Sequence, residues 1–245
     1  MCGRFTLRTP PTLLIAHFDL DVQSQRQLAM FEPRYNIAPT QEIVVIRTDP
    51  IDAHRTATLM RWGLVPSWAK ELGGGPPQIN ARAETLNDKP MFRTAFRRRR
   101  CLIPADGFYE WHGFENSGPK SKKQPYYIHR ADNQPFAFAG LWESWNGPAN
   151  TAGSGESRLV IESCTIVTTA ANKRLSELHD RMPVVLATRD YTSWLDPRIE
   201  DTATLTHLLT PCGEDELTFE PVSTHVNRVA NDDARCIAGQ RSLFD

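Results

Sequence analysis

Short runs of β-branched and aromatic residues recur along the chain, and Pro, Gly or Asn separates each run from the next. Runs of this composition, bounded by turn-forming residues, are typical of strands. We therefore predict strands over residues 43–46, 56–63, 101–103, 108–111, 126–129, 136–141 and 159–168.

Helical patterns occupy other stretches of the chain. Thr9, Pro10 and Pro11 precede apolar residues spaced as on one helix face, which predicts a capped amphipathic helix that continues to Phe18. We predict further helices over residues 89–98, 188–195 and 202–209. The polar stretches 113–124 and 144–157 predict exposed loops that join strands.

Strands and helices do not alternate as they do in a parallel α/β fold. We predict an α+β fold, with a single β-rich domain over residues 1–245. Its sheet is curved, barrel-like and mostly antiparallel, and its helices are peripheral.

The composition is that of an ordinary globular protein. Of 245 residues, 40% are hydrophobic and 23% are charged. No apolar run is long enough to cross a bilayer, and the first residues lack the pattern of a signal peptide. Five cysteines, without a CxxC pair, argue against a disulfide framework and against a zinc site. We expect no metal, no small-molecule cofactor and no membrane partner.

Charge is unevenly distributed, although the net charge is only −1. Arg93 and the four arginines at positions 97–100 form one dense basic block, whereas acidic residues cluster around positions 214–216. A run of arginines is often the solvated end of a helix, where its positive charge interacts favourably with the helix dipole. It can also line a groove that holds phosphate. The sequence leaves both interpretations open.

Cys2 follows the first methionine, and a small side chain at this position permits removal of Met1. Cys2 would then carry a free α-amine beside its thiol, and in model peptides both groups titrate close enough to neutral pH to be nucleophilic. Such a 1,2-aminothiol condenses with an aldehyde to an imine, and the sulfur then closes a thiazolidine ring. The alternative is that Cys2 is only a small apolar residue at an arbitrary position.

Two aromatic side chains, Trp62 and Trp68, flank a turn that contains Gly and Pro. Tryptophans in this setting are core or lid residues, or, when exposed beside arginines, they stack on unpaired bases. Further along the chain, alternation places Asn80, Arg82 and Glu84 on one face. An Asn can orient an amine and an Arg can hold phosphate, although a capped turn before the next helix would also account for this segment.

Glu110 is the one carboxylate within the aromatic stretch 108–112. A carboxyl group among aromatic rings is desolvated, which favours its protonated form and suits it to proton transfer. The alternative is a glutamate on an edge strand that points into water. His179 lies between a predicted helix end and a strand, where a structural and a catalytic histidine would look the same.

Seven segments of the chain, taken in order, resemble the SOS-response-associated peptidase (SRAP) family, whose members process abasic sites. The matching segments are residues 1–5, 34–39, 62–68, 79–85, 104–111, 166–172 and 179–183. They extend from residue 1 to about residue 187, and the part after Asp190 matches loosely.

The resemblance implies a covalent reaction at abasic sites in single-stranded DNA, with lyase-type chemistry that shields the lesion. It assigns catalytic positions to four residues. Cys2 is the covalent residue and Asn80 positions its amine. Glu110 transfers protons and His179 assists. It assigns DNA contacts to Arg4, Trp68 and Arg82. Some relatives carry a second tryptophan after the position of Trp68, where this chain has Ala69, which implies a smaller stacking surface. The widely spread cysteines argue for a reducing cytosol. We expect a cytoplasmic monomer, associated with the nucleoid if its source is bacterial.

Two other functional classes stay open at this point. In an N-terminal-nucleophile hydrolase, Cys2 would attack an amide with its own amine as the base, and removal of Met1 could be autocatalytic. In a plain module for single-stranded DNA, Cys2 would be incidental and binding would be reversible.

Overall fold

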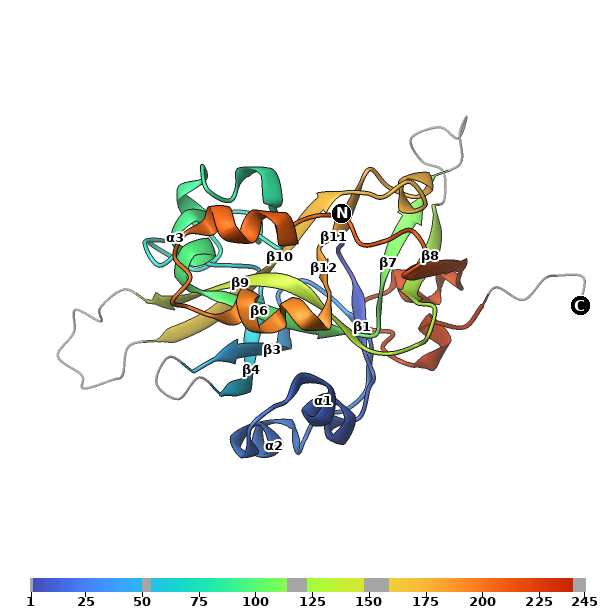
Figure 1. Ribbon diagram of the computed structural model, residues 1–245. Coiled ribbons are helices and arrows are strands. Elements are labelled where there is room, and N and C mark those ends of the chain that lie inside the picture. Colours follow the sequence, from blue (N-terminus) through green and yellow to red (C-terminus); the bar gives the residue numbers. More distant parts are fainter. Residues whose placement is uncertain (1, 50–53, 114–122, 148–158, 240–245) are drawn as a thin grey trace, which may run out of the picture.

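Two β-sheets organise the molecule (Figure 1). The computed structural model describes residues 2–49, 54–113, 123–147 and 159–239. In the larger sheet a ring of five strands closes, because β9 pairs with both β6 and β10, and β10 pairs in turn with β4. These ring strands are β3 (Glu42–Thr48), β4 (Arg55–Trp62), β6 (Arg100–Ala105), β9 (Phe136–Asn146) and β10 (Val160–Ala170).

Three short strands extend this ring: β5 (Asn80–Arg82), β11 (Arg181–Pro183) and β12 (Val185–Leu186). The smaller sheet has the order β13-β8-β7-β1-β2. Its strands are β1 (Phe5–Leu7), β2 (Arg34–Ile37), β7 (Gly107–His112), β8 (Gln124–Arg130) and β13 (Leu217–Pro221). Strand pairing is antiparallel throughout both sheets except where β10 runs parallel to β4 and β5.

The helices are short and lie at the periphery. The α-helices are α1 (Pro11–Phe18), α2 (Val22–Leu28), α3 (Pro90–Arg98) and α4 (Tyr191–Leu195). The 3-10 helices are η1 (Ala83–Thr85), η2 (Leu175–Glu177), η3 (Thr188–Asp190), η4 (Thr202–Leu208), η5 (Thr224–Asn227) and η6 (Ala234–Cys236). None of the helices in the described part of the chain is long and apolar enough to cross a membrane.

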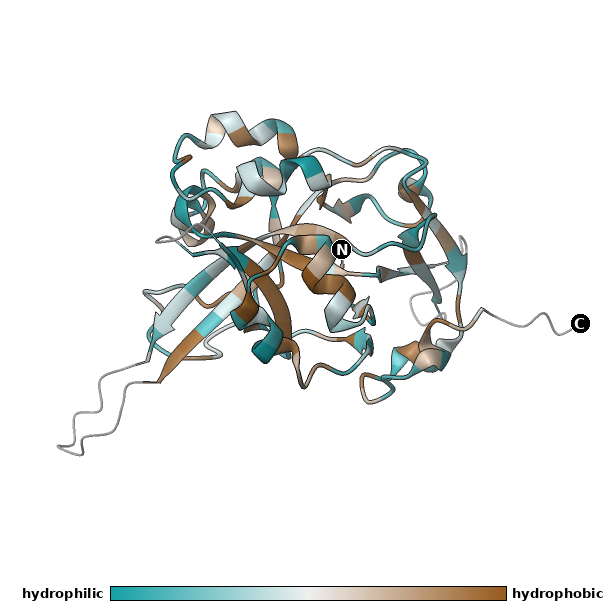
Figure 2. Cartoon of the chain, turned by 60° about the horizontal axis from the view of Figure 1, so that its bottom comes forward, coloured by the Kyte–Doolittle hydropathy of each residue, from teal (hydrophilic) through white to brown (hydrophobic). Residues whose placement is uncertain are grey.

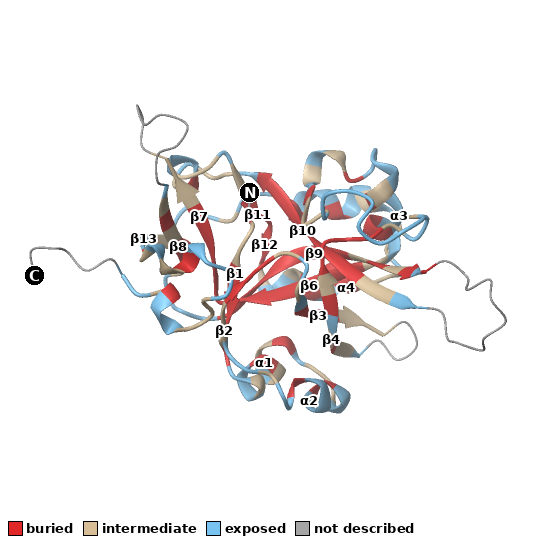
Figure 3. Ribbon diagram, turned by 180° about the vertical axis from the view of Figure 1, so that it is seen from behind, coloured by how far each residue is buried: buried red, intermediate tan, exposed pale blue. Residues whose placement is uncertain are grey.

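The main core fills the ring and the space between the two sheets. Figure 2 shows the most hydrophobic stretches on the central strands, and Figure 3 shows the same strands as the most buried. Phe5 of β1 packs edge-to-face against Trp62 and Phe138, with ring centroids 5.2 and 5.9 Å apart, which joins the smaller sheet to the ring. Gly107 is required at its position, because a Cβ there would lie 2.5 Å from the Tyr127 ring.

The predicted fold class is confirmed, since the structure is a β-rich α+β fold with a closed, mostly antiparallel ring of strands. All seven predicted strands are present with adjusted ends. The missed elements are β1, β2, β5, β11, β12, β13, α2 and the 3-10 helices η1, η2, η5 and η6. Most of these are too short to show a period in the sequence, and neighbouring strands hold them in place.

Three local predictions are wrong. Residues 144–146 belong to β9 rather than to a loop; the remaining loop predictions fall mainly on residues 114–122 and 148–158, outside the described chain. No side chain caps α1, because its N-cap residue is Pro10, whose side chain has no hydrogen-bond acceptor, and the hydroxyl of the preceding Thr9 bonds to Asp106. Residues 202–208 form a 3-10 helix rather than an α-helix, because β-branched threonines are poor helix formers and their hydroxyls bond to nearby carbonyls.

Candidate functional site

Cys2 lies just before β1, inside the fold. Its side chain is fully buried and its thiol donates to the carbonyl oxygen of Arg4 at 3.8 Å. Asn80 Nδ2 donates a 2.9 Å hydrogen bond to the carbonyl oxygen of Cys2. Two residues that are distant in the sequence, Cys2 and Asn80, are therefore held together by the backbone of Cys2.

The protonation of the Cys2 thiol differs from the expectation for a free thiol. Burial, followed by the negative charge of Glu110, raises its pKa well above its usual value, although the hydrogen bond to Arg4 opposes the shift. The thiol is therefore protonated at neutral pH. This shift applies to the chain that retains Met1, and the expectation for the aminothiol freed by removal of Met1 stays a prediction.

Glu110 is buried in the middle of the smaller sheet, with 5% of its surface exposed. Its strand, β7, lies between β1 and β8, and Tyr109 N donates to Arg4 O at 3.0 Å, so residues 2–4 run alongside it. This geometry accounts for the electrostatic effect of Glu110 on Cys2. The alternative of an exposed edge-strand glutamate is wrong.

Asn80 and Arg82 are the two ends of β5, which pairs with Ile166 to Thr168 of β10. The side chain of Arg82 is exposed and makes no ion pair with any residue in the described ranges. Glu84 follows in η1 and forms a bidentate pair with Arg181, with N–O distances of 2.6 and 2.9 Å. Hydrogen bonding to Arg181 lowers the pKa of Glu84.

His179 is half-buried at the start of the segment that enters β11. Its Nδ1 lies 3.0 Å from the backbone N of Arg181 and 2.6 Å from Asp180 Oδ1. One ring nitrogen serves only one of these partners at a time: neutral Nδ1 accepts from Arg181, whereas protonated Nδ1 donates to Asp180. Protonation of His179 would therefore exchange one partner for the other.

The guanidinium of Arg4 is held within the protein. Its Nη1 donates to Asn36 Oδ1 at 2.7 Å and to the carbonyl oxygen of Val226 at 3.1 Å, and its Cζ lies 5.9 Å from the centre of the Trp111 ring. Burial lowers the pKa of Arg4. This residue, expected to contact DNA, therefore has extensive internal contacts.

The two tryptophans of the Gly/Pro turn have separate roles. Trp62 is fully buried and its Nε1 donates to Ile79 O at 3.0 Å, whereas Trp68 is 66% exposed. Beside Trp68 lies a concavity of about 440 Å³, whose lining includes the cationic side chains of Arg61 and Lys70. An exposed aromatic ring beside cations is suited to stacking on a base.

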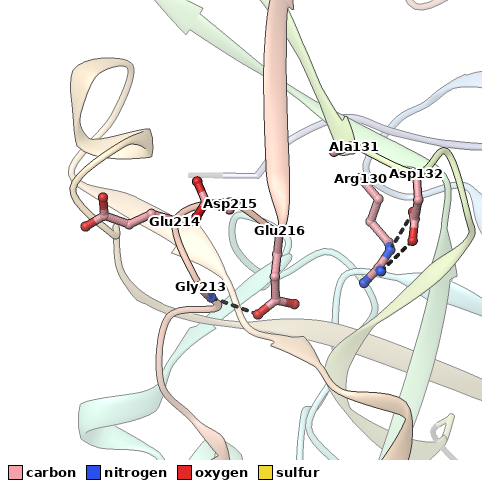
Figure 4. A pocket seen from close by; sticks show the side chains of 7 residues that line it. All are labelled: Arg130, Ala131, Asp132, Gly213, Glu214, Asp215 and Glu216. Atoms are coloured by element: carbon pink, nitrogen blue, oxygen red, sulfur yellow. Dashed lines mark hydrogen bonds and ion pairs between the residues drawn. The ribbon is translucent and has the colours of Figure 1, made fainter.

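A second concavity, of about 350 Å³, is acidic (Figure 4). It is lined by Arg130, Ala131, Asp132, Gly213, Glu214, Asp215 and Glu216. Hydrogen bonds from Arg130 lower the pKa of Asp132 to about 2, so that carboxylate is ionised at neutral pH. The surplus of carboxylates makes this surface unfavourable for phosphate.

One cluster in the described ranges has side chains that could ligate a metal: His225, Asp233 and Cys236. His225 Nδ1 accepts from Asn231 Nδ2 at 3.1 Å, which leaves the proton on Nε2, facing Asp233 at 3.2 Å. Arg235 also binds the carboxylate of Asp233. These contacts form a hydrogen-bond chain, and His225 does not present a free lone pair to an ion.

Sequence reasoning missed three contributors near the site: Arg181, Asn36 and the C-terminal segment around Val226. Arg181 and Asn36 lie within segments that carry the family resemblance, which was the available signal. The partners of Asn36 are some 190 positions further along the chain, and no local pattern reveals such a contact.

Comparisons with known proteins find similarity over nearly the whole chain. The family model described as SOS response associated peptidase (SRAP) matches residues 1–229. The abasic site processing protein YoqW of Bacillus subtilis is 39% identical over 97% of this chain and 99% of its own length. The abasic site processing protein HMCES of Xenopus tropicalis is 31% identical over 85% of this chain and 66% of its own length.

Solved structures share the fold. A protein from Bacteroides thetaiotaomicron superposes with a TM-score of 0.80 at 22% identity, covering 99% of this chain and all of its own. A phage-related protein from Bordetella bronchiseptica superposes with a TM-score of 0.67 at 29% identity, covering 90% of this chain and 94% of its own.

Proposed function

Since the chain belongs to the SOS response associated peptidase (SRAP) family, we propose that it processes abasic sites in DNA by forming a covalent link through Cys2. The two relatives named above are abasic site processing proteins, and they match 97% and 85% of this chain. The observation that carries the proposal is the convergence of Asn80 and Glu110 on Cys2.

The first step uses the α-amine of Cys2, which removal of Met1 would free. The amine attacks C1′ of the open-chain deoxyribose aldehyde and forms a carbinolamine. Glu110 donates a proton to the departing hydroxyl, and water leaves as the C=N bond forms. Asn80, which binds the carbonyl of Cys2, keeps the amine in place during attack.

The second step uses the thiol. An imine left in place acidifies the C2′ hydrogens and invites β-elimination, which would break the strand. The sulfur adds to the iminium carbon, and an S–C bond replaces the C=N π bond, whose electrons become the nitrogen lone pair. The thiol proton passes to Glu110, which the first step left ionised. Because the thiol is protonated in the folded protein, it reacts second, once the adjacent iminium charge makes loss of its proton easier. The product is a thiazolidine.

Single-stranded DNA would be held by exposed groups around this site. Trp68 and Arg82 are both exposed, one suited to stacking and the other to phosphate. Stacking tolerates every base, so we expect weak sequence preference. His179 would assist by protonating the sugar hydroxyl or by helping the ring to reopen, and the two roles stay open.

The test is intact mass spectrometry of the protein after incubation with an abasic single-stranded oligonucleotide. We expect a heat-stable adduct with a mass equal to protein without Met1 plus DNA, less one water. Cys2→Ala should give no stable adduct. Cys2→Ser keeps the amine and should give only an imine that reductant traps, because oxygen replaces the sulfur that closes the ring. A stable adduct with Cys2→Ala would refute the role of Cys2.

A peptidase role is less well supported by the geometry. A cysteine nucleophile acts as its thiolate, and burial together with Glu110 disfavours the thiolate of Cys2. We therefore expect little turnover of external peptides. Removal of Met1 by the protein itself would be tested by comparing the processed fraction of wild type and Glu110→Gln produced in the same host.

A further inference from the structure

The C-terminal segment packs on the face of the smaller sheet that is opposite the main core. Val222, Val226 and Cys236 form a separate apolar cluster with Tyr109 and Tyr127. The hydroxyl of Tyr109 donates to Tyr35 O at 2.7 Å, and Trp111 Nε1 donates to Asn227 Oδ1 at 2.8 Å. The segment is therefore attached to the same strand, β7, that carries Glu110.

Asn36 of β2 is the centre of this attachment. It is fully buried, and its Nδ2 lies within 3.1 Å of the carbonyl oxygens of Val226, Arg228 and Asn231. The carboxylate of Asp232 accepts hydrogen bonds from the backbone N of Tyr35 and of Asn36, and pairs with Arg34. A buried amide with this many partners fixes the segment against β2.

Arg4 joins this attachment to Cys2. Its side chain ends at Asn36 Oδ1 and Val226 O, and its carbonyl oxygen accepts from the Cys2 thiol and from Tyr109 N. The position of that oxygen, and hence of the thiol, depends on where the guanidinium is anchored. We call Arg4, Asn36 and residues 226–232 the clasp.

We propose that the clasp positions the Cys2 thiol for ring closure, so that Arg4 and Asn36 are positioning residues for the reaction. This inference rests on the proposed function. An intramolecular attack depends steeply on the approach of the reacting atoms, and a displacement of about 1 Å can cost about 100-fold in rate. The clasp gives the C-terminal part of the chain a role in the chemistry, and assigns the guanidinium of Arg4 to contacts within the protein rather than to a DNA phosphate.

The experiment compares Arg4→Met and Asn36→Ala with Arg235→Ala, an exposed arginine of the same segment that lies beyond the clasp. Adduct formation is followed against the concentration of abasic single-stranded DNA. Both clasp variants should lower the maximal rate by about 10–100-fold and leave the half-saturating DNA concentration unchanged. Their double variant should be no slower than the slower single variant, because both break one connection. Arg235→Ala should behave as wild type.

The competing outcome is a DNA contact by Arg4. In that case Arg4→Met keeps the maximal rate and raises the half-saturating DNA concentration. It also lowers the slope of log affinity against log salt by about one. That result would overturn the inference. Should Asn36→Ala fail to fold, Arg4→Met, which keeps the apolar stem, decides the question alone.

A second readout needs no DNA. Alkylation of Cys2 by iodoacetamide, followed by peptide mass spectrometry, should be at least about tenfold faster in the two clasp variants than in wild type or Arg235→Ala, because the thiol is no longer held in its buried position. Unchanged alkylation in both clasp variants would overturn the clasp. If alkylation changes as expected but wild type forms no adduct, the clasp holds Cys2 and the proposed function fails.

Discussion

The arginine block at positions 97–100 and the lone arginine at position 82 make opposite use of the same side chain. In the block, Arg100 is buried, with 3% of its surface exposed, and Arg99 pairs with Glu143 at 2.6 Å. Arg82 is exposed beside Asn80 and has no ion-pair partner among described residues. Density of charge in the sequence therefore does not measure the charge available to a ligand.

The reason lies in the ends of two helices. Arg100 donates to the carbonyls of Phe96 and Arg97 at the end of α3, and to those of Trp194 and Asp196 at the end of α4. Carbonyls in the last turn of a helix have no partners within the helix, and the helix dipole stabilises a cation placed there. Burial lowers the pKa of Arg100 to about 10, which still leaves it charged at neutral pH. The helix-end interpretation of the block accounts for these contacts.

The largest effect is expected for Arg100→Met, which tests this contrast. The variant keeps most of the apolar stem and removes a donor shared by four carbonyls, of which that of Asp196 keeps a second donor, the backbone N of Ile199. We therefore expect a loss of about 3 kcal/mol in the free energy of unfolding. Urea denaturation measures it. The DNA affinity of the folded fraction should be unchanged. A stable variant with weaker DNA binding would mean that Arg100 serves the ligand after all.

The next effect concerns Trp68, the exposed ring of the Gly/Pro turn. Trp68→Ala should weaken binding of intact single-stranded DNA by about 1–3 kcal/mol and leave urea unfolding within about 0.5 kcal/mol of wild type. Fluorescence anisotropy with a labelled oligonucleotide measures the affinity. Trp62→Phe, at the buried position of the same turn, serves as the control, which should cost stability rather than affinity. The reverse result would exchange the roles of the two rings.

The strands could be predicted from the sequence because alternation and β-branched residues are local signals, as in β3 and β10. Cys2, Asn80 and Glu110 came from motifs and lie together around one buried thiol. The helix-end interpretation covers the contacts of Arg100 with its own helix. Its contact with Trp194 and the contact of Asn36 with Val226 could not be predicted, because these partners are carbonyl oxygens, which every residue carries, 94 and 190 positions away. Because every residue carries a backbone acceptor, the sequence does not indicate which acceptor a buried side chain binds. These contacts are therefore seen only in the folded structure.

Arg82→Ala should have a smaller effect than Trp68→Ala at physiological salt. One phosphate contact contributes about one unit to the slope of log affinity against log salt, so the slope should fall by about one. Stability should be unchanged, because the side chain is exposed. Affinity titrations at several salt concentrations measure the slope. An unchanged slope would show that Arg82 does not bind phosphate.

The smallest effect is expected for Arg97 and Arg98, the two exposed members of the block. Both pair with Glu200, at 3.5 and 3.1 Å, and each side chain is more than half exposed. Solvent screens such pairs, so the double change Arg97→Ala and Arg98→Ala should alter the free energy of unfolding by less than about 1 kcal/mol. It should also leave the salt dependence of DNA binding unchanged, because Glu200 already neutralises part of this charge and the block serves helix ends. A slope reduced by about two units would show that the exposed half of the block reaches the DNA, and the contrast between the two arginine sites would then hold only for Arg99 and Arg100.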